Sequence, residues 1–456
     1  MRRKIRFITP GRRVAARDYW FGIANGVLFT LAEALSDANL VLALFIRELG
    51  GPLTLVGLLP SLKNGGWLLP QLVAAGRLQA RRLVLPVYRK ASIARVIAWS
   101  ALTATIFFAP ELGRGPALWL FLLFYAAYNL GGGASGLAFQ VVVAKVIPPS
   151  RRGSFFGYRN LLGGLLAFFI AGPLVRTLIS QGSPLPFPYN YSLLMAVALI
   201  CIAVGLFAFN MVREPAAEEV GQRETTRAML SHIPRLLRGD AHYRRFIVVR
   251  LLGRLGMIAD PFYIIYALEV LHVPAQMVGV YLATRTISAA LSNLLWGRIA
   301  DRQGIQRLLV LTSRLTVAVP VMALALPFIA WLFNLHSIWL GWAFGVVFLL
   351  IGLTVDGSAT AGLTYLMELA SPADRPRYIG VSNTLLGIAT FLPVLGGILV
   401  DLVQYEGLFA IAALASFTAW RMALLLPEPR ALAEKPAEPP EPPEPTEPVI
   451  EQPHVP

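Results

Sequence analysis

Long apolar runs, separated by short polar segments, dominate the chain from about residue 20 to about residue 426. A helix rises 1.5 Å per residue, so about 20 residues cross about 30 Å of hydrocarbon. The pattern therefore predicts about twelve membrane-spanning helices. The first run, from about Tyr19 to Ile46, is too long for a signal peptide and is interpreted as the first span. The predicted spans cover roughly residues 20–46, 53–76, 91–109, 116–144, 154–178, 190–211, 246–270, 275–297, 307–332, 337–367, 378–401 and 404–426.

Basic residues alternate between the predicted loops. The N-terminal segment, the central loop and the loops after the second, fourth, eighth and tenth spans are basic. The loops on the other side hold little beyond Arg47 and Arg114. Because cytoplasmic loops carry an excess of arginine and lysine, we expect a multi-pass protein of the cell inner (plasma) membrane with both termini in the cytoplasm.

The composition favours a protein whose surface is covered by lipid. Hydrophobic residues make up 56% of the chain and charged residues only 14%, whereas a soluble protein carries about a quarter charged residues. The mean hydropathy is +0.63. The net charge of +15 is carried by short loops between apolar runs, so we expect no nucleic-acid binding.

The chain shows no residue pattern of an enzyme or a metal site. Its single cysteine, Cys201, lies in an apolar run, and none of its five histidines has metal-ligand spacing. The sequence also holds no phosphate loop and no nucleophile–base pair. We therefore expect no enzymatic activity, no cofactor and no metal.

The two halves of the chain repeat one another. The segments 149–163 and 372–386 align at a constant separation of 223 residues, and both follow predicted cytoplasmic loops. Repeats in the same membrane orientation are related by an axis along the membrane normal. We therefore predict an all-α membrane protein with two parallel six-helix repeats. The matched pairs are Arg152 with Arg375, Gly157 with Gly380, and Asn160 with Asn383.

A second pair of segments follows the second span of each half. The first copy is Gly76-Arg77-Leu78, and the later copy runs Gly297-Arg298-Ile299-Ala300-Asp301-Arg302-Gln303-Gly304 with basic residues after it. The later copy resembles the loop signature of the major facilitator superfamily, Gly-x-Leu-Ala-Asp-Arg-x-Gly. Together with the repeat and the spans, the resemblance covers roughly residues 15–427.

The resemblance implies two six-helix bundles that rock about a central site, in a protein that is usually a monomer. It implies that Gly297 allows a tight helix end and that Asp301 contacts a helix end of the opposite half. We expect that contact near Arg152. The first copy departs from the signature, because Ala80 stands where aspartate is expected.

The segments outside the spans differ in composition. The tail alternates proline and glutamate and cannot form a core. The later part of the central loop places apolar residues among arginines, which is typical of an amphipathic helix on the inner membrane surface or of a solvated linker. The predicted parts are a basic N-terminal segment (1–18), an N-terminal bundle (19–212), the central cytoplasmic loop (213–245), a C-terminal bundle (246–427) and a disordered cytoplasmic tail (428–456).

Ionisable residues inside the spans are the candidate site, because a charge in hydrocarbon usually faces a cavity or a partner. Glu33 and Asp37 are four residues apart and should share a helix face, and Asp260 is the repeat equivalent of Asp37. The spans that hold them line the central cavity in the family that the chain resembles. The candidates are Glu33, Asp37, Lys63, Asp260, Arg285 and Asp356.

Two roles remain open for these residues. Burial raises the pKa of a carboxylate, so Glu33, Asp37 or Asp260 could carry a coupling proton. The aspartates could instead hold the bundles together. Lys63 and Arg285 could bind an anionic substrate or pair with Asp37 and Asp260. Arg250 and Arg254 are expected to extend towards the inner surface.

The leading hypothesis is a proton-coupled secondary transporter of a small solute or drug. Efflux has weak support, since Gly172-Pro173 matches only part of the glycine-rich motif of exporters. The alternative is a non-transporting protein of the same fold that acts in pigment, lipid or complex assembly. Gradient-driven flux through purified protein separates the two.

Overall fold

The computed structural model describes residues 12–79, 81–216, 233–334, 336–370 and 375–429. The described part of the chain is helical and contains no strand. Several predictions fall outside it. These are the basic segment before residue 12, Ala80, the first part of the central loop and the tail from residue 430.

The N-terminal half contains six spans. They are α1 (Arg12–Leu35) with α2 (Val41–Glu48), α3 (Leu53–Gln79), α4 (Leu85–Phe107), α6 (Arg114–Val146), the segment α7 (Pro149–Leu166), η1 (Ala167–Ala171) and α8 (Gly172–Ile179), and finally α9 (Tyr189–Asn210). A four-residue helix, α5 (Ala109–Leu112), joins α4 to α6.

The C-terminal half repeats this order. Its spans are α12 (Ala241–Gly256) with η2 (Met257–Ala259) and α13 (Tyr263–Glu269), then α14 (Met277–Gln303), α15 (Ile305–Leu332), α16 (Ser337–Leu369), α17 (Arg375–Ala389) with the start of α18 (Leu392–Ala423), and the rest of α18. Gln404, with a φ of 62°, divides α18 into the eleventh and twelfth spans. The sequence predicted a boundary at this place.

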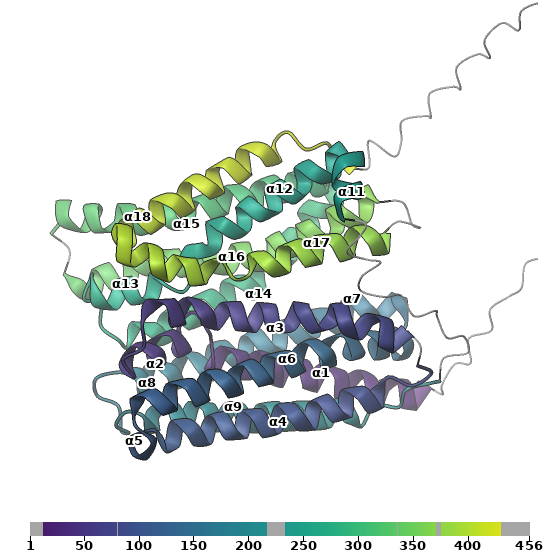
Figure 1. The fold of residues 1–456 in the computed structure, drawn as a ribbon, viewed down its shortest axis with the longest axis horizontal. Coiled ribbons are helices and arrows are strands. Elements are labelled where there is room, and N and C mark those ends of the chain that lie inside the picture. The colour runs from purple at the N-terminus through teal and green to yellow at the C-terminus, as the bar shows by residue number, and fades with distance from the viewer. Residues whose placement is uncertain (1–11, 80, 217–232, 335, 371–374, 430–456) are drawn as a thin grey trace, which may run out of the picture.

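The two halves lie side by side, with the described chain ends at one end of the molecule (Figure 1). We call this the terminal end; the other, where α2, α5 and α13 lie, is the opposite end. The second and fifth spans form the two largest interfaces between the halves. In one, α3 packs on α17 and α18, and in the other, α14 packs on α7, η1 and α8. The second span of each half thus meets the fifth span of the other, as a two-fold relation between repeats requires.

The outer surface is apolar, as lipid contact requires. Trp119, Phe207 and Trp331 expose 64%, 64% and 76% of their surface. Among the described residues, seven helical stretches are long and apolar enough to cross a membrane, and one of them holds the eleventh and twelfth spans. The predicted fold class, an all-α membrane protein with two six-helix repeats, is confirmed.

The first and seventh spans are broken, which the sequence did not predict. Helix α1 ends at Leu35, and α2 begins at Val41. Asp37 lies in this turn, where its Oδ1 accepts the backbone N–H groups of Asn39 (2.9 Å) and Leu40 (3.1 Å). Asp260 lies in the equivalent turn between η2 and α13. The expectation that Glu33 and Asp37 share a helix face is therefore wrong, because the helix ends between them.

A carboxylate caps the third span of each half at the terminal end. Glu214, whose side chain is 1% exposed, accepts the N–H groups of Val84 (2.8 Å) and Leu85 (2.7 Å) and pairs with Lys145 (2.6 Å). In the second half, Glu428 accepts the N–H of Gln306 (2.9 Å). A negative charge at a helix N-terminus is favourable because the free N–H groups and the helix dipole point at it.

The described part of the central loop forms helix α11 (Ile233–Gly239). Its Ile233, Leu236 and Leu237 pack against the C-terminal half beside buried residues such as Tyr243 and Phe246. The apolar side of α11 therefore covers the bundle. It follows neither of the two expectations, a helix on the membrane surface or a solvated linker.

Candidate functional site

A cavity of about 690 Å³ lies in the N-terminal half, with Leu363 of α16 on its far wall. It extends from Ser36, at the break after α1, to Phe156 and Asn160 near the start of α7. Since α7 begins at the terminal end (Figure 1), the cavity extends from the middle of the molecule towards that end.

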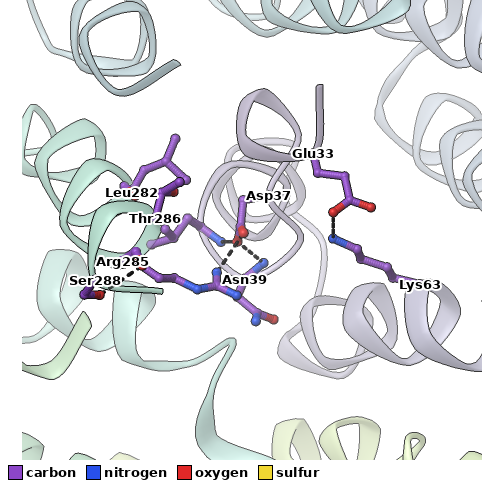
Figure 2. A network of polar contacts seen from close by, with 9 residues as sticks. Glu33, Asp37, Asn39, Lys63, Leu282, Arg285, Thr286 and Ser288 are labelled. Atoms are coloured by element: carbon purple, nitrogen blue, oxygen red, sulfur yellow. Dashed lines mark hydrogen bonds and ion pairs between the residues drawn. The ribbon is translucent and has the colours of Figure 1, made fainter. Parts of the chain in front are cut away.

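Glu33 and Lys63 are predicted site residues that line this cavity. The Lys63 Nζ lies 3.6 Å from the Glu33 Oε2, and both side chains are partly exposed (Figure 2). Lys63 therefore pairs with Glu33, and the expectation that it pairs with Asp37 or Asp260 is wrong.

Two further arginines in the cavity wall were missed from the sequence. Arg95 of α4 is only 7% exposed. Its Nη1 donates to the Ser135 Oγ (3.2 Å), and its guanidinium lies over the rings of Tyr128 (4.4 Å) and Phe29 (4.9 Å). The buried Nε has no hydrogen-bond partner.

Arg159 of α7 is the second. Its Nη1 donates to the Gly22 carbonyl (2.8 Å) and the Asn25 Oδ1 (3.4 Å), and its guanidinium lies 4.5 Å from the Phe139 ring centre. Both arginines lie near the ends of predicted spans, where a cation usually reaches water.

A smaller cavity of about 180 Å³ lies in the C-terminal half, and Asn64 lines both cavities. Arg250 and Arg254 line the smaller one. The Arg250 Nη1 donates to the Ser358 carbonyl of α16 (2.6 Å), inside the bundle. The expectation that these arginines extend to the inner surface is therefore wrong.

An ion pair joins the two broken-helix regions across the interface between the halves. The Arg285 Nη1 of α14 donates to the Asp37 Oδ2 (2.7 Å), and the two side chains are 21% and 12% exposed (Figure 2). Asp37 thus uses one carboxylate oxygen for its own turn and the other for the opposite half. The expected pairing of Arg285 with an aspartate is present.

The remaining two candidates surround the same arginine. Asp260 lies within electrostatic range of Arg285 and Arg254. Asp356 accepts from the Asn293 Nδ2 (2.9 Å) and lies within electrostatic range of Arg285 and Glu33. The structure therefore brings all six sequence-predicted site residues into one charged network at the centre of the molecule.

The opposite end is closed by contacts between the halves. Across the interface, the Arg47 Nε donates to the Glu269 Oε1 (2.8 Å), and within the C-terminal half the Tyr405 hydroxyl donates to the Glu269 Oε2 (3.3 Å). In the same region a Cβ at Gly57 or Gly397 would overlap backbone atoms of the facing helix, so α3 and α18 lie in direct backbone contact. These contacts hold the two halves together at the opposite end.

The loop-motif residues lie at the terminal end. Gly76 and Arg77 lie in α3, while Gly297, Arg298, Asp301 and Arg302 are exposed on the last turns of α14. Gly304 follows with a φ of 89°, and a Cβ there would overlap the Glu428 carboxylate.

The expected contact between Asp301 and Arg152 is not among the ion pairs of the described residues. Arg152 donates to the carbonyls of Ala144 (2.7 Å) and Ile147 (3.1 Å) in its own half. The contact stays a prediction for a state in which the terminal end is closed.

The residues of the 149–163 and 372–386 repeat take different positions. Asn160 lines the larger cavity, and Gly157 has open space beside it. Gly380 is buried and Asn383 exposed on α17, which begins at Arg375. In the part of the chain that the structure describes, no three His, Cys, Asp or Glu residues are grouped to hold a metal ion.

Comparison with known proteins supports the resemblance carried by the loop motif. Residues 254–454 match the sequence model of the Major Facilitator Superfamily. No curated protein matches the sequence.

Solved structures of transporters share the fold at low sequence identity. A variant of the nucleoside transporter NupG matches with a TM-score of 0.66 and 14% identity, over 89% of this chain and 99% of its own. A D-xylose-proton symporter matches at 0.63 and 14%, over 91% and 99%. A bacterial homologue of the iron transporter ferroportin matches at 0.62 and 13%, over 92% and 99%. The fold is that of transporters of the Major Facilitator Superfamily, and the predicted resemblance is confirmed.

Proposed function

We propose that this chain, which has the fold of Major Facilitator Superfamily transporters, is a proton-coupled secondary transporter of a small solute that works by alternating access. The observation that carries the proposal is the ion pair between Asp37 and Arg285. It links the two halves at a helix break, beside a cavity large enough for a small solute.

The arrangement of contacts fits one access state of such a transporter. The halves meet at the opposite end through Arg47 and Glu269, and the larger cavity extends towards the terminal end. We place both termini in the cytoplasm, so the terminal end faces the inside of the cell. This state is then inward-facing. The outward-facing state requires the Asp37–Arg285 and Arg47–Glu269 pairs to separate.

Separation of a buried ion pair is costly unless each charge finds another partner. Arg285 has one within range, because Asp260 lies in its own half. A proton on Asp37 removes the attraction between the halves and leaves Arg285 to pair with Asp260. Proton binding thus moves Arg285 from a partner across the interface to a partner within its half, which couples protonation to opening of the opposite end.

Neighbours of the same fold carry different cargoes by their titles, including nucleosides, D-xylose with protons, and peptides. At 14% identity these likenesses transfer the fold alone. Support for proton coupling in this chain therefore comes from Asp37, Asp260 and Arg285.

The test uses purified protein in sealed vesicles with an imposed pH gradient and a panel of labelled solutes. We expect saturable uptake that the gradient drives in the wild-type protein. We expect Asp37→Asn and Asp260→Asn to exchange solute but not to concentrate it. Glu111→Gln, which removes an exposed carboxylate of α5, is the matched control and should behave as the wild type.

Two results would contradict the proposal. Solute accumulation that is equal in the wild type and both variants would exclude a coupling role of Asp37 and Asp260. Folded protein that carries no solute of the panel would favour the alternative, an assembly protein with this fold.

A further inference from the structure

We propose that the larger cavity binds an aromatic organic anion, with its charged group at Arg95 and Arg159 and its apolar body against the aromatic wall. This inference rests on the proposed transport function and names the substrate class. It starts from two arginines that no carboxylate compensates.

Arg95 is a buried cation with unused hydrogen-bonding capacity. It is 7% exposed, its Nε is buried without a partner, and its one side-chain acceptor is a neutral hydroxyl, that of Ser135. The guanidinium lies over the rings of Tyr128 and Phe29. Such stacking leaves the N–H edges of an arginine free for a carboxylate, which the planar fork binds with two parallel hydrogen bonds.

Arg159 approaches the same place from α7. Its acceptors are also neutral, a backbone carbonyl and the Asn25 amide. Tyr88 lies within electrostatic range of both Arg95 and Arg159. Both arginines thus lie near one tyrosine, and all three residues line the cavity.

The backbone makes room for both arginines. A Cβ at Gly26 of α1 would overlap the Arg159 guanidinium, and a Cβ at Gly131 of α6 would press on the Arg95 side chain at 2.9 Å. In α1 and α6, a glycine therefore leaves the space that the arginine side chain occupies. The positions of these cations are part of the packing of the bundle.

The charge of the cavity is unbalanced. Three cations and one anion line it, and the anion, Glu33, pairs with Lys63. Within the described residues, Arg95 and Arg159 take part in none of the ion pairs. Buried charges in proteins are normally paired. An anionic ligand would supply the negative charge that the protein does not place beside these two arginines.

The rest of the wall indicates the body of the ligand. Trp67, Trp99, Tyr125 and Phe139 are among the aromatic residues that line the cavity. Its volume of about 690 Å³ falls in the range of about 300–1,000 Å³ that is usual for small-molecule sites. An aryl ring with one carboxylate matches both the aromatic wall and the uncompensated arginines.

The experiment compares naphthalene-2-carboxylate with naphthalene-2-carboxamide, which have the same shape and differ in charge. Full-length protein in vesicles of phosphatidylcholine, which add no anionic headgroup, is titrated with each probe by calorimetry. We expect the wild-type protein to bind the carboxylate on the order of 10- to 100-fold more tightly, the usual range for a hydrogen bond to a charged group. Equal affinity for the two probes, or no binding of the carboxylate, would overturn the inference without any variant.

Variants assign the effect to the two arginines. Arg95→Gln and Arg159→Gln should each reduce carboxylate affinity about 10-fold or more and leave amide affinity unchanged. Arg89→Gln is the matched control, because Arg89 lies on the same helix as Arg95 but is exposed and donates to the Asn210 carbonyl. Unchanged discrimination in both cavity variants would overturn the inference.

Flux measurements with the same probes separate this inference from the proposed function. Saturable transport of the amide in place of the carboxylate would overturn the anion site and leave the transport function standing. Arginine-dependent binding of the carboxylate without any flux would support the site and contradict the transport function.

Discussion

The substitution Asp37→Asn tests the link between the two halves. Asparagine keeps an oxygen that can accept the N–H groups of Asn39 and Leu40, so the turn after α1 should survive. It loses the charge that attracts the Arg285 guanidinium at 2.7 Å. The change therefore isolates the contact across the interface from the local role of the side chain.

The size of the effect follows from the burial of the pair. Loss of one partner of a buried ion pair costs about 3–5 kcal/mol. Arg285 and Asp37 are 21% and 12% exposed, and Asp260 lies near enough to compensate part of the charge. We expect a loss of about 2 kcal/mol, which shifts the equilibrium between the two access states about 30-fold towards opening of the opposite end.

Distance measurement between two spin labels detects this shift. Glu111 of the N-terminal half and Val270 of the C-terminal half are exposed at the opposite end. Each is replaced by cysteine to carry a label. The cysteines are introduced in a Cys201→Ala background, since Cys201 is the single cysteine. We expect Asp37→Asn to move population from a short to a longer distance.

A matched control weakens the other contact between the halves at this end. Arg47 and Glu269 are 32% and 40% exposed, so their pair is worth about 0.2–1 kcal/mol. Arg47→Gln should therefore shift the distances less than Asp37→Asn does. Identical distance distributions in the wild type and Asp37→Asn would refute the reasoning, as would a larger effect of Arg47→Gln.

Two further predictions concern stability at the terminal end. Glu214→Gln should cost about 1.5–3 kcal/mol, because it leaves Lys145 without its charged partner; a thermal melt of detergent-purified protein that matches the wild type would contradict this. Gly304→Ala should cost about 1–3 kcal/mol, because its φ of 89° is strained for alanine and its Cβ meets Glu428. Gly297→Ala, at an uncrowded position inside α14, is the control in the same assay and should not lower the melting temperature.

Much of the architecture could be predicted from the sequence because it depends on composition and spacing. The apolar runs locate the spans, and the separation of 223 residues pairs Asp37 with Asp260 as equivalent positions. Both residues lie where their helices are broken. A charged residue in an apolar run had to face a cavity or a partner, so all six candidates lie in the central network.

The breaks themselves were missed because hydropathy does not change across them. The run from about residue 20 to 46 is apolar on both sides of the turn. Weaker signals were present, since aspartate and asparagine favour turns at Asp37 and Asn39, and Pro261 has no backbone N–H to continue the helix.

The arginines of the cavities could not be placed for a different reason. Arg95, Arg159, Arg250 and Arg254 lie near span ends, where a cation usually reaches water. Whether such a side chain faces lipid, water or a cavity depends on the rotation of its helix against neighbours distant in sequence. Packing supplies that information, and the pattern of one helix does not.

The most direct test of alternating access is the accessibility of Asn64, which is exposed and lines both cavities. The variant Asn64→Cys in the Cys201→Ala background is treated with a membrane-impermeant thiol reagent from each side of oriented vesicles. We predict labelling from the terminal side in this variant, and labelling from the opposite side once Asp37→Asn is added. Labelling from the terminal side alone in both proteins would contradict a site that opens in turn to each face of the membrane.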